Sequence, residues 1–573
     1  MRGVVGAAVG LAFAASVGAQ PAPIPPAATP GGAQPFRARP DLTTEVLGEV
    51  FAVPPLAERP LGLDEGPRVK VRAWHLASPL SRRTYGVMLN DVQAMMDAHL
   101  ATQPPEGFTV NQMQAFADEI ALYYRSRGLF LTQAFVPAQE VRDGVVVIQL
   151  LEGQLGSVAV EGNTIYDADT VELPFMGLVG APIREDQIEE ALLTLQEFPG
   201  LTVFGTFREG ANLGETELLV QVREEDRATY TPIVDNYGSE YTGKGRFMLD
   251  IDVNNPFGAA DRIAAYVLKT WDPANGVYGG IDYLTTIGER AQSRIGGGFA
   301  RNTFDVSDPT AGNDLGLHGI VEQADVRWQR SFAQSRTYRG GGALALAYKE
   351  AVTEQPGDDP IDELYSLSYT YDFFSVSSRR RGMNVGYVRA IAGDNRGERV
   401  SRRGGSGATS AGSFSKLDFS YQRLQRFSPN HALLMRLEGQ ASNELLASLE
   451  QYSIGGPANV RAYPVSEALI DTGGAATVEW IIDAPGFAKR PLGTRTWGDV
   501  FQVSVYADWA GGEVNDPFPF QDDTVNLRGY GLGLQLALPN RFSLRVDVAT
   551  PDSGVEPSNG RDPQTYVGFN VTF

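Results

Sequence analysis

The carboxyl-terminal part of the chain, from about Asp226 to Phe573, alternates between apolar and polar side chains and shows no helical periodicity. In residues 542–548 every second side chain is apolar, whereas Arg545 and Asp547 stand between them. A period of two places all the apolar side chains on one face of a β-strand. The pattern recurs in residues 247–254, 417–422, 433–438, 501–508 and 531–538. The sequence therefore predicts long strands with one apolar and one polar face.

Such strands could form a soluble sandwich, but their length and charge pattern favour a membrane barrel. They approach the roughly nine to eleven residues that a tilted strand needs to cross a bilayer. One face is almost purely apolar, as contact with lipid requires, and the other carries charges, as an aqueous lumen allows. The sheet must close, because an open edge in lipid would leave backbone groups unpaired. At about 22 residues for each strand and its connection, residues 227–573 predict a mainly β fold with a transmembrane barrel of roughly sixteen strands.

The connections and the chain end indicate how this barrel is oriented and closed. Pro539-Asn540 is a two-residue turn, whereas the connections near 510–527 and 550–563 are long and rich in Gly, Asp and Pro. Short periplasmic turns and long external loops are typical of outer-membrane barrels. The chain ends within an alternating strand, which must pair with the first strand of the barrel. We predict a carboxyl-terminal assembly signal consisting of Val567, Phe569, Val571 and Phe573.

The amino-terminal residues are typical of a cleaved secretory signal. Arg2 precedes a run of apolar and small residues from Val4 to Val17, and Val17-Gly18-Ala19 suits a signal peptidase. A transmembrane helix is the alternative, although the run is short for one. We expect a signal peptide over residues 1–19.

Residues 20–67 are expected to form a Pro-rich linker. Their first half, residues 20–40, is rich in Pro, Ala and Gly, a composition that favours disorder. Farther along, Leu42, Val46, Leu47, Val50 and Phe51 follow helical spacing until Pro54 and Pro55. This short pattern is compatible with a plug helix and equally with a continuation of the linker.

Two small α/β modules are predicted between the linker and the barrel. Residues 68–153 read as strand, helix, helix, strand and strand, and the second helix begins with a capping box between Thr109 and Gln112. Residues 154–226 repeat this order in a shorter form, with an apolar helical stripe in 187–198 that Pro199-Gly200 ends. Two similar modules in tandem indicate a repeat.

The composition argues against several functional classes. The 573 residues carry a formal net charge of −21, which opposes binding to nucleic acid or to anionic lipid surfaces. There is no Cys, and the four His residues lie in different elements without metal-ligand spacing. No phosphate-cradling loop and no nucleophile-elbow motif is present. We therefore expect no enzyme activity, no cofactor and no metal site.

Four motifs, in order, resemble those of the ShlB/FhaC/HecB family of two-partner secretion transporters. Residues 124–137 are similar to the family's first POTRA domain, and 235–258 are similar to its first barrel hairpin. Residues 452–463 resemble its long inward-folded loop, and 506–511 resemble the barrel-wall motif that meets this loop. Each motif is short, but the four cover nearly the whole mature chain. The resemblance implies two POTRA domains, over 68–153 and 154–226, and a sixteen-stranded barrel over 227–573.

The resemblance also implies a site inside the barrel. Its loop tip corresponds to Val460, Arg461, Ala462 and Tyr463, and its wall partner corresponds to Asp508. Alternation along the strand points Asp508 into the lumen, where a charge-assisted pair with Arg461 would hold the loop. The alternative is that both are ordinary lumen charges. The family has Gly where this chain has Ala462, so a tip that needs positive φ or close backbone approach would be strained.

By this resemblance, the chain would capture an unfolded secreted protein through its POTRA domains and export it through the barrel without ATP. The implied partners are a large β-helical exoprotein, outer-membrane lipid, the barrel-assembly machinery and periplasmic chaperones, with no nucleic acid. The implied location is the outer membrane, with the amino-terminal domains in the periplasm. A barrel-assembly factor of the same superfamily and a passive porin remain as alternatives.

Overall fold

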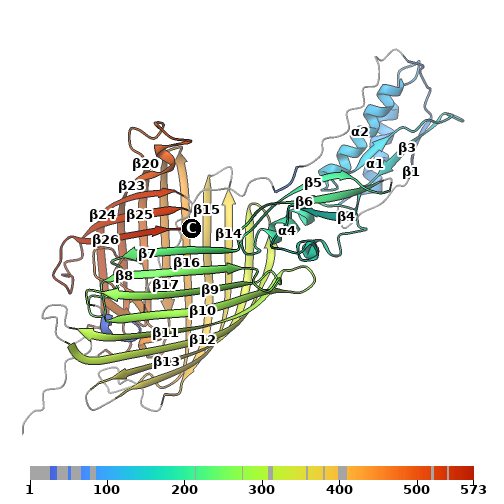
Figure 1. The fold of residues 1–573 in the computed structure, drawn as a ribbon. Helices are drawn as coiled ribbons and strands as arrows, with labels where there is room; N and C mark the ends of the chain where they lie inside the picture. Colours follow the sequence, from blue (N-terminus) through green and yellow to red (C-terminus); the bar gives the residue numbers. More distant parts are fainter. Residues whose placement is uncertain are drawn as a thin grey trace, which may run out of the picture.

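A computed structural model describes most of the chain. The described residues are 26–34, 50–52, 66–77, 86–212, 214–273, 275–307, 314–355, 359–377, 381–397, 409–517, 522–538 and 541–573. The predicted signal peptide over 1–19, the turn at Pro539-Asn540 and the first part of the helical pattern in 42–51 lie outside these residues. Figure 1 shows a large barrel with two small α/β modules at one of its ends.

The barrel contains sixteen antiparallel strands in the described residues and is closed, as the alternation predicted. Successive wall strands are neighbours all the way round. Two short hairpins in the connections, β18-β19 and β21-β22, form sheets of their own and are not part of the wall. The wall consists of β7 (Ala228–Asp235), β8 (Gly245–Asn254), β9 (Arg262–Trp271), β10 (Gly276–Ile287), β11 (Ser293–Ser307), β12 (Asp314–Gln334), β13 (Tyr338–Glu354), β14 (Ile361–Ser377), β15 (Gly382–Asn395), β16 (Gly412–Ser428), β17 (His431–Ala441), β20 (Thr472–Asp483), β23 (Phe501–Glu513), β24 (Thr524–Leu538), β25 (Phe542–Pro551) and β26 (Gln564–Val571).

The two faces of the wall differ as predicted. On β23, Val505 and Trp509 are exposed on the outside, whereas Ser504 and Asp508, which directly precede them in the sequence, are buried inside. Large apolar side chains are exposed on the outer face of strand after strand, as lipid contact requires. Examples are Phe247, Val267, Ile281, Phe299, Val326, Leu346, Leu367, Val388, Phe419, Leu437, Val478, Leu532, Val548 and Phe569. No helix in the described ranges is long and apolar enough to cross a membrane.

The seam between β26 and β7 closes the barrel with little regular pairing. Their register is confined to Gly568–Asn570 against Ile233–Asp235, whereas β25 and β26 pair over the whole of 542–549. Pro232 lies in β7 and has no N–H to donate to a ladder. The chain end extends the seam, because Tyr230 and Phe573 exchange two backbone hydrogen bonds of 3.1 and 3.0 Å. The last residue therefore contributes to closure.

Deletion of Phe573 is expected to lower the amount of inserted, heat-modifiable barrel several-fold, because it removes both of these hydrogen bonds and the terminal ring together. The Phe573→Ala variant separates the two causes, since it keeps the backbone hydrogen bonds and loses only the ring, which is 75% exposed. Barrel abundance in outer membranes, read from the heat-dependent shift on gels, is the measurement. Normal abundance in the deletion variant would refute the assembly role predicted for the chain end.

The two α/β modules share one topology. The first contains β1 (Ala73–Ala77), α1 (Leu89–Ala101), α2 (Val110–Ser126), β2 (Gln133–Phe135) and β3 (Val145–Leu151). The second contains β4 (Gln154–Glu161), α3 (Ala168–Glu172), α4 (Glu185–Leu195), β5 (Leu201–Glu209) and β6 (Glu215–Glu225). The sheet orders are β1-β3-β2 and β4-β6-β5, so in each module the first strand lies beside the last. The predicted tandem repeat is therefore present in the fold.

Local signals in the first module act as predicted. The Thr109 hydroxyl accepts from the Gln112 N–H at 3.2 Å, and the Gln112 side chain accepts from the Thr109 N–H at 3.0 Å, which completes the capping box. His99, in the last turn of α1, stacks on Phe116 and Phe108, with ring centroids 4.0 and 4.6 Å apart. Burial lowers the pKa of the His99 imidazole, and this favours the neutral form.

The second module is docked on the barrel through helix α4. Glu189 accepts from Arg336 at 2.7 Å, in the connection between β12 and β13. Glu197, just beyond the helix, accepts from Arg294 of β11 at 2.8 Å. Because the second module contacts the β12–β13 connection and the start of β11, this end of the barrel, which carries turns such as 335–337 and 429–430, faces the module. The inward loop, which follows β17, begins at the opposite end.

The linker differs from the expectation at both of its described parts. Residues 26–34 were expected to be disordered, but they contain a short 3-10 helix, Pro26–Ala28, with Ala28 only 2% exposed. Val50 and Phe51 were placed in a helical pattern, yet Phe51 pairs with Gly205 in a β-bridge. In both cases the conformation comes from contacts with distant parts of the chain rather than from local propensity.

Candidate functional site

A long loop folds into the barrel between β17 and β20, over residues 442–471. Within this loop, β18 (Tyr452–Ile454) and β19 (Ala468–Ile470) pair as an antiparallel hairpin. Gly455 and Gly456 adopt φ of 102° and 87°, which side chains other than Gly rarely adopt. The Gly456 N–H donates to the Tyr463 carbonyl at 3.0 Å, and the Asn459 side chain accepts from the Gly455 N–H at 2.8 Å. The tip, residues 455–463, is thus a compact unit held by hydrogen bonds of its own backbone and of the Asn459 side chain.

The structure brings the predicted loop residues and their predicted partner together. Val460, Ala462 and Tyr463 are fully buried, and Arg461 and Asp508 are 3% and 4% exposed. Arg461 Nε donates to Asp508 Oδ2 at 2.9 Å, and Nη2 donates to Oδ1 at 2.9 Å. The Arg461 backbone N–H adds a third hydrogen bond, to Asp508 Oδ2 at 3.1 Å. This bidentate arrangement is one that Lys cannot reproduce.

Arg461 meets more acidic groups than the sequence predicted. Its Nη1 donates to Glu479 of β20 at 3.0 Å and to Asp547 of β25 at 3.2 Å. Arg545 also binds both of these carboxylates, at 2.9 and 2.7 Å. The guanidinium of Arg461 lies over the Tyr506 ring, 3.1 Å from its centroid. A cluster of three carboxylates and two guanidinium groups therefore joins the loop tip to three wall strands.

Ala462 stands where the family has Gly, and its methyl group fits because the wall residue that faces it is a glycine. Ala462 is not among the described residues with positive φ, so the alanine adopts an ordinary backbone conformation. Gly529 of β24, the register partner of Asp508, faces it. A Cβ at Gly529 would collide with the Ala462 Cβ and would lie 2.9 Å from the Thr550 carbonyl. The close approach thus occurs here between Ala462 and Gly529.

We expect Gly529→Ala to destabilise the seated tip by about 1–3 kcal/mol, the usual cost of overpacking. Adding Ala462→Gly should recover part of this loss, because the contact with the Thr550 carbonyl remains. Gly279→Ala on β10 is the matched control, since its Cβ would meet only the Tyr266 carbonyl, at 3.3 Å. Limited proteolysis of the loop in purified protein measures the effect. Equal loop protection in the single and double variants would show that Ala462 and Gly529 are not coupled.

Tyr463 links the tip to the closing strand of the barrel. The Tyr566 hydroxyl, on β26, donates to the Tyr463 carbonyl at 2.6 Å. The Tyr463 hydroxyl donates to the Val555 carbonyl at 2.9 Å in the connection between β25 and β26. Across the seam, the rings of Tyr566 and Tyr237 are T-shaped with centroids 6.0 Å apart. The tip therefore contacts the wall from β20 to the seam.

A second anchor of the loop, at Glu450, was not predicted from the sequence. Glu450 is 2% exposed and lies at the base of the loop. Lys349 of β13 donates to it at 2.7 Å, and Lys416 of β16 contacts its other oxygen at 2.9 Å. The Glu450 backbone carbonyl accepts from Lys416 at 2.8 Å and from Gln440 at 3.0 Å. The loop is thus held by a buried anion, Glu450, against β13 and β16, and by a buried cation, Arg461, against the strands from β20 to β25.

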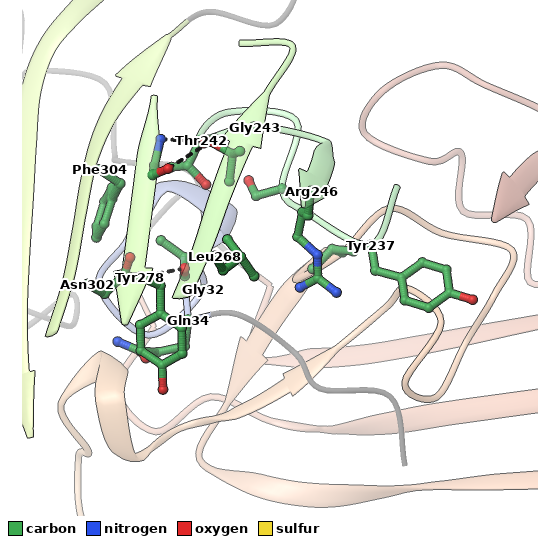
Figure 2. A pocket seen from close by; sticks show the side chains of 16 residues that line it. Gly32, Gln34, Tyr237, Thr242, Gly243, Arg246, Leu268, Tyr278, Asn302 and Phe304 are labelled. Carbon is green, nitrogen blue, oxygen red and sulfur yellow. Dashed lines mark hydrogen bonds between the residues drawn. The ribbon is translucent and has the colours of Figure 1, made fainter. Parts of the chain in front are cut away.

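Residues 26–34 lie in the lumen beside the same loop, close to the end of the barrel that faces away from the modules. Ala28 contacts Phe304 and Val306 at the end of β11. The Ser466 hydroxyl of the loop donates to the Gly32 carbonyl at 2.9 Å, and Asn302 donates to the Ala33 carbonyl at 3.1 Å. Figure 2 shows this segment against the inner wall, beside a small cavity lined by Gly32, Gln34, Tyr278, Asn302 and Phe304.

Small residues make this close fit possible. A Cβ at Gly31 would overlap the Ser448 backbone carbonyl, and the Gly31 N–H donates to the Ser448 hydroxyl at 3.3 Å. The Ser239 hydroxyl, in the connection between β7 and β8, donates to the Ala27 carbonyl at 3.0 Å. The Gly-, Ala- and Pro-rich composition that suggested disorder is thus what allows this segment to approach the loop and the wall. No cluster of metal-ligating side chains occurs within the described ranges.

Sequence comparisons identify both parts of this architecture. Residues 92–153 match the POTRA domain, ShlB-type. Residues 214–282 match the haemolysin secretion/activation protein ShlB/FhaC/HecB. The chain is thus similar to the ShlB/FhaC/HecB family both in its first POTRA domain and at the start of its barrel. It is accordingly an outer-membrane barrel of the two-partner secretion type, with its POTRA domains in the periplasm, and its short turns face that compartment.

Curated relatives of the family are similar over most of the chain. The heme/hemopexin transporter protein HuxB of Haemophilus influenzae is 22% identical over 485 residues, which cover 81% of each chain. The outer membrane transporter CdiB of Escherichia coli is 26% identical over 152 residues, which cover 26% of each chain. These relatives are transporters, which points away from an enzyme.

Solved structures share the fold. CdiB from Escherichia coli has a TM-score of 0.68 at 18% identity, over 92% of this chain and 94% of that one. CdiB from Acinetobacter baumannii has a TM-score of 0.59 at 16% identity, over 94% and 95%. BamA from Haemophilus ducreyi, lacking POTRA domains 1–3, has a TM-score of 0.53 at 12% identity, over 88% and 100%. The architecture is therefore common to these barrels, and identities this low speak for the fold alone.

Proposed function

We propose that this chain exports a secreted partner protein across the outer membrane. The partner reaches the periplasm unfolded, is captured by the POTRA domains and passes through the barrel to fold outside. A large β-helical exoprotein is the expected partner, because such a chain folds progressively once it emerges. The periplasm supplies no ATP and the chain carries no phosphate-cradling loop, so folding outside the cell would make return unfavourable.

One observation carries this proposal: two POTRA modules stand at one end of a barrel whose lumen holds a loop and an amino-terminal segment fixed by specific side chains. A passive porin has no use for the two modules. In the first module, β1 pairs with β3 on one side within the described residues, so its other side is an edge at which an extended chain can add as a strand. Strand addition uses backbone hydrogen bonds and suits an unfolded client of any sequence.

The test compares the proteins released into the medium by cells with and without the gene. We expect one or a few large exoproteins to disappear from the medium and to return with the wild-type gene. Purified protein in liposomes should then translocate the same exoprotein, added unfolded, without nucleotide. An unchanged set of released proteins would reject export.

Barrel assembly is the second candidate, because the fold is shared with BamA. The two functions predict different defects in the same cells. An assembly factor would lower the abundance of many outer-membrane barrels, whereas an exporter would leave them unchanged. Quantifying outer-membrane proteins in the deletion strain separates the two candidates.

A further inference from the structure

Residues 50–52 of the linker form an added strand on the second POTRA module. They lie along β5, whose other side pairs with β6. The Gly205 N–H donates to the Val50 carbonyl at 2.8 Å, and the Ala52 N–H donates to the Gly205 carbonyl at 3.4 Å. The bridge between Phe51 and Gly205 is parallel. A segment from outside the module therefore occupies the edge of its sheet.

The side chain of Phe51 fills an apolar pocket between the two modules. Phe51 is 5% exposed. Its ring lies 5.8 Å from the ring of Phe130 in the first module and 5.9 Å from that of Phe207 on β5. The pocket exists because Gly205 has no side chain: a Cβ there would lie 3.2 Å from the Phe51 Cβ and 2.9 Å from Leu192 Cδ1. Edge and pocket together form a site for an extended segment with one aromatic side chain.

The added strand is short and its anchoring is local. The described contact consists of residues 50–52, and the weaker of its two backbone hydrogen bonds is long, at 3.4 Å. Elements with few hydrogen bonds open at low free-energy cost. The other anchor is one buried ring, that of Phe51, whose pocket is lined by residues of the two modules.

We propose that residues 50–52 are an internal competitor of the client, which occupies the β5 edge until an extended segment of the exported protein displaces it. The inference rests on the proposed capture by the POTRA domains and assigns a part in it to the β5 edge of the second module, in addition to the β1 edge of the first. The occupant would be an unfolded polypeptide that pairs in parallel with β5 and places an aromatic or large apolar side chain in the pocket of Phe51. Strand addition with a side-chain pocket gives affinity from the backbone and selectivity from the ring.

Competition of this kind lowers the apparent affinity of the edge. A site that is open only part of the time binds with its intrinsic affinity reduced by the open fraction. Removing the internal strand should therefore strengthen binding at this edge without changing the pocket itself.

The first experiment measures occupancy of the edge without any client. The probe is a fluorescent peptide with the sequence of residues 47–54, added to the purified full-length protein. We expect Phe51→Ala in the protein to strengthen peptide binding at least about tenfold, because the internal strand no longer competes. A peptide with the same Phe replaced by Ala should not bind. Equal peptide affinity for wild type and the variant would overturn the proposal.

The second experiment locks the strand in place. The chain has no Cys, so Phe51→Cys with Gly205→Cys introduces a single candidate pair. The expected Cβ separation of 3.2 Å is slightly below the usual range, and Leu192 must shift. We expect the oxidised protein neither to bind the peptide nor to export. Reduction should restore export and peptide binding, the latter more weakly than in the Phe51→Ala variant, because a side chain at position 205 narrows the pocket. The control pair, Glu209→Cys with Thr216→Cys, joins register partners on β5 and β6 and should bind and export in both states.

The two readouts separate failure of this inference from failure of the proposed function. Export by the oxidised Phe51→Cys/Gly205→Cys protein would show that the client does not use this edge and would overturn the inference, with export itself intact. If no variant, the wild type included, exports a protein, the proposed function fails. Peptide binding would then still report whether residues 50–52 compete for the edge.

Discussion

Arg461→Ala is expected to reduce export at least about tenfold at equal barrel abundance, because it removes the cation that holds the loop tip in the wall. The buried carboxylate of Asp508 would lose its ion pair, and those of Glu479 and Asp547 would keep only their pairs with Arg545 among the ion pairs of the cluster. Breaking a buried ion pair from one side costs about 3–5 kcal/mol, which is enough to release the tip. Arg461→Lys should restore little, since Lys cannot bind Asp508 through two parallel hydrogen bonds.

Asp508→Ala should be the milder single change, because Arg461 keeps Glu479 and Asp547. The double variant should be no worse than Arg461→Ala alone, since removing Asp508 also removes excess negative charge. This non-additivity is the signature of a coupled pair. Arg327→Ala is the matched control, because Arg327 binds the wall residues Asp282 and Asp325. The measurement is export of the partner protein by the two single variants and the double variant. Fully additive defects would show that Arg461 and Asp508 are ordinary lumen charges.

Glu450→Leu is expected to cause the second large loss of export, because it leaves Lys349 and Lys416 facing each other without their shared carboxylate. The side chain of Lys416 is only 7% exposed, so its charge cannot be well solvated. We expect the base of the loop to detach, with a several-fold fall in export and faster cleavage of residues 442–471 by added protease.

The direction in which a second substitution changes export tests this explanation. Adding Lys416→Leu to Glu450→Leu removes both buried charges, and replacing a buried pair by apolar residues is often tolerated. The double variant should therefore export better than Glu450→Leu. Glu322→Gln, which loses a partly exposed pair with Arg301, serves as the control. A double variant worse than the single one would show that charge pairing at Glu450 does not hold the loop.

Much of the fold could be predicted because one physical contrast runs along the whole barrel. Lipid outside and water inside impose a period of two on every strand, and this period is visible locally, as in residues 542–548. The inward direction of Asp508 follows from the same alternation. The POTRA helices were visible for a similar reason, since Thr109 and Gln112 form a signal within four residues.

The rest could not be predicted because it depends on register between distant strands. Glu479 and Asp547 face inward by alternation, but so do many other charges, and only the pairing of β20, β23 and β25 places these two at Arg461. Glu450 meets Lys349 across 101 residues of sequence. The order of residues 26–34 likewise comes from the barrel wall, since their own composition favours disorder.

The short seam also bears on how the barrel forms. Thr231 and Thr572, which contact each other across it at 3.3 Å, are separated by 341 residues. Every other wall pairing joins strands that follow each other along the barrel, so it can form by zippering from hairpin to hairpin. Joining β26 to β7 closes the longest loop of the chain and so costs the most conformational entropy of any wall pairing. The seam has the least regular pairing to offset that cost. We therefore expect this junction to be the last to form during assembly, and its formation to set the rate at which a complete barrel appears.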